Sequence, residues 1–265
     1  FNPEASPINE KTRQITVDPL QALTQVFSTL QNSITNEVKG SNTSGASVLV
    51  VLYLYGQVYT AHVGDCQATV GKIDRDYGTR TCTRLTTPHT TDNPEEHART
   101  EKEGAFISPP ELQGINERSR LWKTPFGIGG ITKTRAIGET ELTGVGVIST
   151  PEVNVHGVSD DNTQNFIMIA NAGLWEVLDP LEAARFMHKH IPKSRNASKS
   201  IVALVKHATE LWKERDTKAE YHLRDAVTAG VIYLPGFDQR LYKMKEQVPD
   251  DSDGNFGCGI FSTGD

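Results

Sequence analysis

Five side chains beside expected strand ends could take part in chemistry: Asp65, Cys66, Asp225, His62 and His89. Asp225 precedes an apolar strand and is either a metal ligand or a turn residue, whereas the carboxylate of Asp65 is expected to cap its own hairpin turn. Nothing near Cys66 in the sequence is basic enough to lower its pKa, so an unreactive thiol is expected. The two histidines lack the spacing of a zinc motif, which favours hydrogen-bonded structural groups.

The segment from Phe166 to Leu178 holds the most informative position of the chain. Its apolar start, 166–170, ends in a glycine-containing turn, and a helix is expected to begin near Asp179. A strand that stops at such a turn often presents a side chain to a binding or catalytic site. The side chain in that place is the methyl group of Ala172, which has no lone pair to offer.

The composition is that of an ordinary globular protein. With 265 residues, of which 37% are hydrophobic and 23% charged, the chain can bury a sizeable core. The net charge of -6 argues against nonspecific binding to nucleic acid or anionic membranes. Three cysteines without a CxxC pair predict reduced thiols in an intracellular, cytoplasmic protein. No apolar run reaches the roughly 18 residues of a membrane span, and the start at Phe1 leaves N-terminal targeting open.

Hydrophobic periodicity predicts strands that come as hairpins, with helices before, between and after them. Asp18 and Pro19 mark a helix start, as N-cap and first helical residue. The face that this helix is expected to bury consists of Leu20, Leu23, Val26, Phe27, Leu30, Ile34 and Val38. The further expected elements are a hairpin of 46–55 and 58–63 around Gly56-Gln57, strands at 67–73, 84–86, 105–107, 151–155, 165–170 and 227–234, and helices at 93–104, 180–190 and 199–215.

These elements divide the chain into three parts. Residues 1–17 are polar and irregular, 18–235 carry the periodic elements, and 236–265 form an acidic, glycine-rich tail. A small apolar island at 256–261 is expected to dock either on the domain or on a partner. The pattern of the middle part predicts an α+β domain, in which helices cover antiparallel sheets.

Several short motifs follow one another in a specific order. They are Gly45-Ala46-Ser47, Ala61 to Ala68, Leu85 to His89 followed by Glu95, Arg99 and Gly104, Thr134 to Glu139, Pro151-Glu152-Val153, Ala170 to Leu178, and Asp225 to Thr228. Each motif alone is weak, but their order and spacing together resemble the metal-dependent protein serine/threonine phosphatases of type 2C over residues 18–235. The resemblance implies a fold of two central antiparallel β-sheets sandwiched between helical layers.

The resemblance also implies a two-metal hydrolase centre, of which this sequence lacks most ligands. The family's centre holds two Mg²⁺ or Mn²⁺ ions, which require carboxylate oxygens. Three of its ligand positions fall on Asp225, which has a carboxylate, and on Ala172 and Pro88, which have none. The family's Asp-Gly-His-Gly-Gly segment, which supplies the bridging aspartate, has no counterpart in residues 1–17. Arg13 does not match the arginine that clamps phosphate in the family.

A degenerate metal centre favours a pseudophosphatase, which acts as a binding or regulatory module. No catalytic residue and no bound cofactor are then expected, Asp225 is an isolated remnant, and the partner is a protein such as a kinase, a phosphoprotein or a complex subunit. Two alternatives stay open. One is an active phosphatase that depends on Mg²⁺ or Mn²⁺ and whose missing ligands lie upstream of Phe1. The other is a domain whose cleft holds a phosphorylated ligand without turnover.

Overall fold

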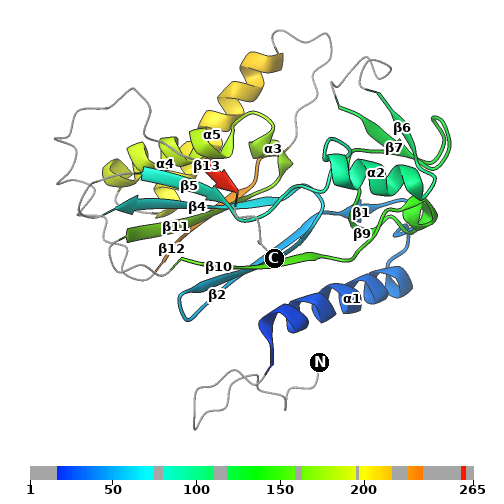
Figure 1. Ribbon diagram of the computed structural model, residues 1–265. Coiled ribbons are helices and arrows are strands. Elements are labelled where there is room, and N and C mark those ends of the chain that lie inside the picture. The colour runs from blue at the N-terminus through cyan, green and yellow to red at the C-terminus, as the bar shows by residue number, and fades with distance from the viewer. Residues whose placement is uncertain are drawn as a thin grey trace.

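The computed structural model describes residues 17–74, 80–109, 118–158, 163–194, 197–216, 226–234 and 258–260. Two β-sheets lie face to face, and helices cover both outer surfaces (Figure 1). Neighbouring strands within these two sheets run antiparallel, except for one short parallel pair at an edge. The predicted α+β fold, with two central antiparallel sheets between helical layers, is confirmed.

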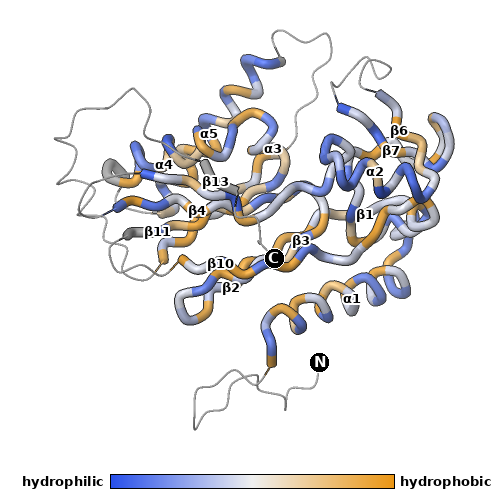
Figure 2. The backbone as a smooth tube through the Cα atoms, viewed as in Figure 1, coloured by the Kyte–Doolittle hydropathy of each residue, from blue (hydrophilic) through white to orange (hydrophobic). Residues whose placement is uncertain are grey.

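The two sheets differ in size. The larger has the order β12-β11-β4-β5-β13, and its strands are β4 (Gln67–Asp74), β5 (Arg80–Arg84), β11 (Thr163–Ala170), β12 (Ala229–Tyr233) and β13 (Cys258–Ile260). The smaller has the order β10-β3-β2, and its strands are β2 (Val48–Leu54), β3 (Gln57–Val63) and β10 (Glu152–Gly157). Side chains from both sheets, among them Val58, Val70 and Ile167, meet in a buried cluster. The hydrophobic segments in Figure 2 follow these strands, because the strands supply the core.

Helix α1 (Pro19–Glu37) covers the outer face of the smaller sheet. It begins as predicted, since the carboxylate of Asp18 accepts a hydrogen bond from the backbone N–H of Leu20 at 3.1 Å. Leu23 and Phe27 are buried, whereas Val26 and Val38 are about half exposed and were wrongly assigned to the buried face. A helix that rests on a sheet buries a stripe of limited width, which leaves Val26 outside it. Val38 lies beyond the last helical residue, with an extended backbone, so it no longer follows the helical spacing.

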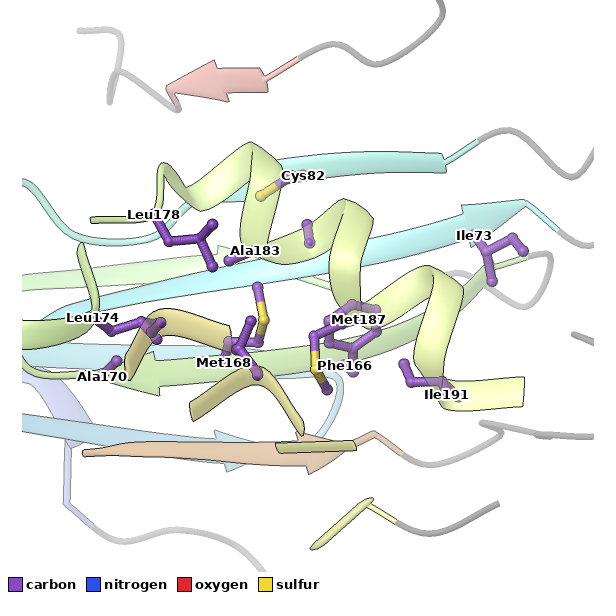
Figure 3. Packing of buried hydrophobic residues seen from close by; sticks show 13 residues of the cluster. Ile73, Cys82, Phe166, Met168, Ala170, Leu174, Leu178, Ala183, Met187 and Ile191 are labelled. Carbon is purple, nitrogen blue, oxygen red and sulfur yellow. The ribbon is translucent and has the colours of Figure 1, made fainter. Parts of the chain in front are cut away.

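Helices α4 (Pro180–Ser194) and α5 (Ala197–Asp216) cover the outer face of the larger sheet. Figure 3 shows Phe166 and Met168 of β11 packed beneath α4, which contributes Met187 and Ile191. The predicted helices at 180–190 and 199–215 are therefore confirmed, each with slightly longer ends than the sequence pattern indicated.

Two predicted strand boundaries were wrong. The hairpin turn consists of Tyr55 and Gly56 instead of Gly56 and Gln57, and its two positive φ values, 47° and 80°, suit the twist of a two-residue hairpin. The strand expected at 84–86 is instead β5, which ends at Arg84. Beyond this end, the backbone N–H of Ala68 donates to the hydroxyl oxygen of Thr86 at 2.9 Å, so a side chain takes the place of the ladder.

A smaller unit lies beside the two main sheets (Figure 1). Residues 122–131, a glycine-rich segment for which no strand was predicted, contribute to a three-stranded sheet with the order β6-β7-β8. The elements of this region are β1 (Gly45–Ala46), α2 (Pro94–Lys102), β6 (Phe106–Ser108), β7 (Arg120–Trp122), β8 (Gly129–Ile131) and β9 (Ile137–Gly138). The helix predicted at 93–104 and the strand predicted at 105–107 correspond to α2 and β6.

The apolar island of the predicted tail contributes β13, whose backbone pairs in parallel with β5. This pairing docks the island on an edge of the larger sheet, which decides between the two alternatives for its position. Residues 1–16 and 235–257 lie outside the described part of the chain, so the predicted boundaries at 17 and 235 stay predictions. Among the described helices, none is both long and apolar enough to cross a membrane.

Candidate functional site

Ala172 lies where β11 meets α3 (Ala172–Trp175), a single helical turn. The preceding residue, Asn171, is bound to the end of the neighbouring strand: its amide oxygen accepts from the backbone N–H of Thr228 at 2.9 Å, and its amide nitrogen donates to the carbonyl of Ala226 at 2.5 Å. The half-buried Ala172 therefore stands beside residues 226–228. Asp225 is the residue before this segment and lies outside the described residues.

Packing holds the turn around Ala172 in its shape. Leu174 is fully buried, the indole N–H of Trp175 donates to the carbonyl of Ala170 at 3.0 Å, and the indole of Trp212 on α5 donates to the carbonyl of Gly173 at 2.7 Å. Trp175 packs against the core cluster below α4. None of these contacts needs a carboxylate at position 172.

Pro88 lies in the segment that follows β5. It is half-buried and lines a pocket together with Arg84, Leu85, Thr86, Thr87, Glu152, Asn154 and His156. Its ring carries no atom that could coordinate a metal ion.

The described residues at the family's ligand positions do not fit a carboxylate-bound pair of Mg²⁺ or Mn²⁺ ions. Ala172 and Pro88 offer no oxygen from their side chains, and hard cations of this kind bind oxygen ligands. The amide of Asn171 does not replace the missing group, because both of its ends are engaged by the backbone of residues 226 and 228.

Asp65 has a structural partner other than the one predicted. Its carboxylate does not cap its own turn but accepts a hydrogen bond from the hydroxyl of Ser47 at 2.6 Å, and that hydroxyl in turn accepts the N–H of Asp65 at 3.2 Å. The backbone N–H of His89 donates to the backbone carbonyl of Gly64 at 2.9 Å. Three of the motifs that resemble the phosphatase family thus hold one another in place through this turn.

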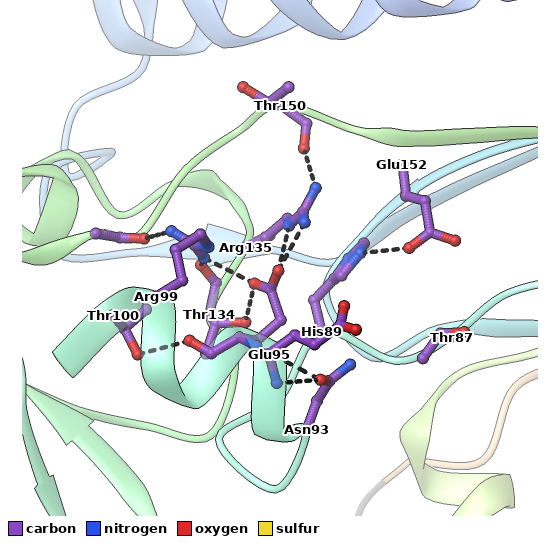
Figure 4. Close-up of polar contacts among 12 residues, drawn as sticks. Thr87, His89, Asn93, Glu95, Arg99, Thr100, Thr134, Arg135, Thr150 and Glu152 are labelled. Atoms are coloured by element: carbon purple, nitrogen blue, oxygen red, sulfur yellow. Dashed lines mark hydrogen bonds and ion pairs between the residues drawn. The ribbon is translucent and has the colours of Figure 1, made fainter. Parts of the chain in front are cut away.

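A buried carboxylate joins two further motifs. Glu96 on α2, whose side chain is 5% exposed, accepts hydrogen bonds from Arg99 at 2.7 Å, from Arg135 at 2.6 and 3.1 Å, and from the hydroxyl of Thr134 at 2.7 Å. Figure 4 shows the donors Arg99, Thr134 and Arg135 close to one another beside α2. Burial alone would raise the pKa of the Glu96 carboxyl, but these three donors outweigh burial and hold that pKa at about 2.

His62, His89 and Glu152 form a second cluster, which lies beside the first. The imidazole rings of His62 and His89 stack with their centroids 4.4 Å apart. Nε2 of His89 is 3.3 Å from the Glu152 carboxylate, and Figure 4 shows these two side chains pointing toward each other. Burial, together with the neighbouring His89, lowers the pKa of His62 to about 4. Burial opposes ionisation of Glu152 as well, but the hydrogen bond from His89 and the charge of His62 hold the pKa of that carboxyl below its usual range.

The sequence interpretation of the two histidines missed this cluster. Both were expected to be structural groups, and both do make hydrogen bonds, but no short spacing marks them as a pair with Glu152. A usable signal was that each of the three residues lies in one of the motifs that resemble the phosphatase family.

The expectation of an unreactive Cys66 agrees with its surroundings. Burial and the adjacent carboxylate of Asp65 raise the pKa of the thiol to about 11, so it stays protonated near neutral pH. Among the described residues, Cys66 is a free thiol.

The facing sheets, the helical layers and the turn at Ala172 define a domain of the type 2C phosphatase class. The family model of protein phosphatase 2C matches residues 5–214, and the chain therefore belongs to this family. A probable protein phosphatase 2C 64 of Oryza sativa subsp. japonica is 30% identical over 194 residues, which cover 73% of this chain and 43% of the relative. A probable protein phosphatase 2C 72 of Arabidopsis thaliana is 25% identical over 213 residues, covering 80% and 61%. The chain thus spans about half the length of these relatives.

Solved structures share the fold. The serine-threonine phosphatase 2C from Toxoplasma gondii superimposes with a TM-score of 0.64 at 21% identity, covering 80% of this chain and 66% of that one. A sex determining protein of C. elegans gives a TM-score of 0.62 at 15% identity, covering 88% and 51%. At these identities the likeness establishes the architecture alone.

Proposed function

We propose that this protein phosphatase 2C-like domain does not hydrolyse phosphomonoesters and acts as a protein-binding or regulatory module. The observation that carries the proposal is Ala172, which follows the residue bound to 226–228 and has a methyl group at a position where the resemblance to the family implies a metal-binding carboxylate. Pro88 supports it independently. Two divalent ions carry four positive charges, and a site without converging carboxylates holds them poorly.

A phosphate-release assay tests the proposal directly. The purified protein, supplied with millimolar Mn²⁺ and a phosphoserine peptide, is expected to release no more phosphate than the same sample with a chelator. Any release above this background should be repeated with Asp225→Ala, which leaves a contaminating phosphatase untouched. Mn²⁺-dependent hydrolysis that is lost in this variant would overturn the proposal, and the domain would then be an active serine/threonine phosphatase.

Restoring one carboxylate should restore metal affinity in part. We predict that Ala172→Asp binds Mn²⁺ at least about tenfold more tightly than the unchanged protein, because it adds a charged oxygen ligand at the turn beside residues 226–228. Isothermal titration calorimetry would measure this difference. Ala172→Asn is the matched control, since it has the same size without the charge. Equal affinities of the aspartate and asparagine variants would show that position 172 does not face a metal site.

The partner of such a module is expected to be a protein, such as a kinase, a phosphoprotein or a subunit of a larger complex. A candidate contact surface is the turn between β7 and β8, where Phe126 and Ile128 are 56% and 44% exposed. Exposed aromatic and aliphatic side chains of this size are typical of protein-binding sites. Once a partner is found by proximity labelling, Phe126→Ser with Ile128→Ser should abolish its binding. The exposed Val202→Ser on α5 serves as the control.

A further inference from the structure

We propose that His62, His89 and Glu152 form a binding site for a divalent metal ion of the zinc class, separate from the carboxylate centre typical of the family. The three residues come from different elements: His62 from β3, His89 from the segment after β5, and Glu152 from the start of β10. One possible ligand atom from each lies within 4.8 Å of one from each of the others. This is the only such cluster of three among the described residues.

The hydrogen bonds around the histidines leave nitrogen atoms available. Nε2 of His62 is 2.7 Å from the carbonyl oxygen of Thr87, an acceptor only, so the proton lies on Nε2 and Nδ1 carries a lone pair. Nδ1 of His62 is buried and has no partner among the described residues, whereas the ligand atom of His89 would be Nε2, which faces Glu152. A buried polar atom without a partner is costly, and a bound ion would satisfy it. Histidine ligands of metals commonly donate their other N–H to a backbone carbonyl, as His62 does.

The spacing of the cluster is close to that of a metal site. Ligand atoms around a tetrahedral zinc ion lie about 3.3 Å apart, given metal–nitrogen distances of about 2.0–2.1 Å. Nε2 of His89 and the Glu152 carboxylate are already 3.3 Å apart, which is long for a charge-assisted hydrogen bond. The stacked imidazole of His62 would have to rotate toward them, since parallel rings do not direct their lone pairs to one point.

The donor set determines which ion would bind. Two imidazole nitrogens and one carboxylate oxygen suit Zn²⁺, and also Co²⁺ or Ni²⁺, whereas Mg²⁺ and Ca²⁺ prefer oxygen ligands throughout. Three protein ligands leave one coordination position open for water. The pocket that contains Pro88, Asn154 and His156 is lined by Glu152 as well, and it gives the ion a path of entry from solvent.

Binding would fasten three elements that only hydrogen bonds and packing now join. β10 and β3 are neighbours in the smaller sheet, and His89 precedes the segment that leads to α2. The ion would therefore stabilise the folded domain, because the ligands are brought together only on folding. This inference does not depend on whether the domain hydrolyses phosphate.

Equilibrium dialysis with ZnCl₂, followed by elemental analysis, tests the site on the whole chain. We expect one zinc ion per chain and a thermal transition raised by several degrees. His62→Asn should weaken binding by roughly a hundredfold, since loss of a direct ligand costs at least as much as loss of a supporting group. Asparagine keeps a polar side chain of smaller size at this position, so the variant should fold. Glu152→Gln keeps the shape of the side chain and should weaken binding as well.

His97→Asn is the matched control. His97 lies on α2, 36% exposed and paired with Glu101, so a surface effect of histidine would appear there as well. Co²⁺ added in place of zinc should give visible absorption bands of tetrahedral nitrogen and oxygen coordination, and these should vanish in His62→Asn. Zinc binding that is absent, or equally strong in the His62, Glu152 and His97 variants, would overturn the proposal.

Discussion

Glu96→Ala is expected to lower the free energy of unfolding by about 3–5 kcal/mol, the usual effect of removing one partner from a buried ion pair. The Glu96 carboxylate is the shared acceptor of Arg99, Thr134 and Arg135, and its loss leaves two guanidinium groups without a countercharge. Their side chains are 28% and 19% exposed, so water replaces the carboxylate only in part. Urea denaturation followed by circular dichroism would measure the change.

Glu95→Ala is the control for this substitution, because Glu95 is the exposed neighbour of Glu96 in the same helical turn. Its effect should stay within about 0.5 kcal/mol, apart from a small contribution of its charge at the helix start. If both alanine variants unfold at the same urea concentration, the carboxylate of Glu96 does not hold the two motifs together.

Glu96 also makes stability depend on pH. Its pKa is lowered from 4.5 to about 2 in the folded state, so its contribution is fully present above the unfolded pKa and is lost as pH falls toward the folded one. The difference corresponds to about 3 kcal/mol. We expect Glu96→Gln to be less stable than the unchanged protein at pH 7 and to lose less stability than it between pH 5 and pH 2. Parallel stability curves for the two proteins would contradict this.

Gly64→Ala has the second large expected effect, a loss of about 2–5 kcal/mol. The residue adopts a φ of +84°, where a side chain costs about 1–2 kcal/mol. A Cβ atom there would overlap the hydroxyl of Ser47 and lie 2.7 Å from its Cβ and 3.0 Å from its Cα. Overpacking of this kind adds about 1–3 kcal/mol, since the contacted backbone cannot move away easily.

Gly104→Ala separates the two contributions. Gly104 has a φ of +94°, but an added Cβ would meet no atom within 4 Å. Its loss should therefore equal the backbone cost alone, about 1–2 kcal/mol. If Gly64→Ala destabilises no more than Gly104→Ala in the same denaturation experiment, the turn is not confined by Ser47.

The contacts that hold the backbone of this domain in place are distinct from the metal ligands of the family. The turn at Gly64, the Glu96 network and the packing around Trp175 fix the backbone through contacts that involve no metal ligand. The fold therefore persists although Ala172 and Pro88 provide no oxygen. This separation is the physical reason why a chain can keep the fold of the phosphatase family whether or not it keeps the metal ligands.

Local patterns in the sequence determined most of the elements. The capping pair Asp18-Pro19, the apolar spacing of α4 and α5, and the alternation in β10 depend on neighbours within one or two turns, so they could be predicted. The boundary of β5 could not, because the hydroxyl of Thr86 binds the N–H of a residue in another strand. The partner of Asp65 was missed for the same reason, since Ser47 belongs to a different segment.

The sequence by itself determined which donors are missing, because the absence of a carboxylate at Ala172 and Pro88 follows from residue identity. Only the tertiary structure decided which groups meet. His89 and Glu152 are 63 residues apart, and the pairing of β10 with β3 brings Glu152 opposite His62. Strand register and loop paths set such contacts, and they depend on packing over the whole domain. The sequence therefore shows directly which side chain stands at each position, while a cluster such as His62, His89 and Glu152 becomes visible only in the fold.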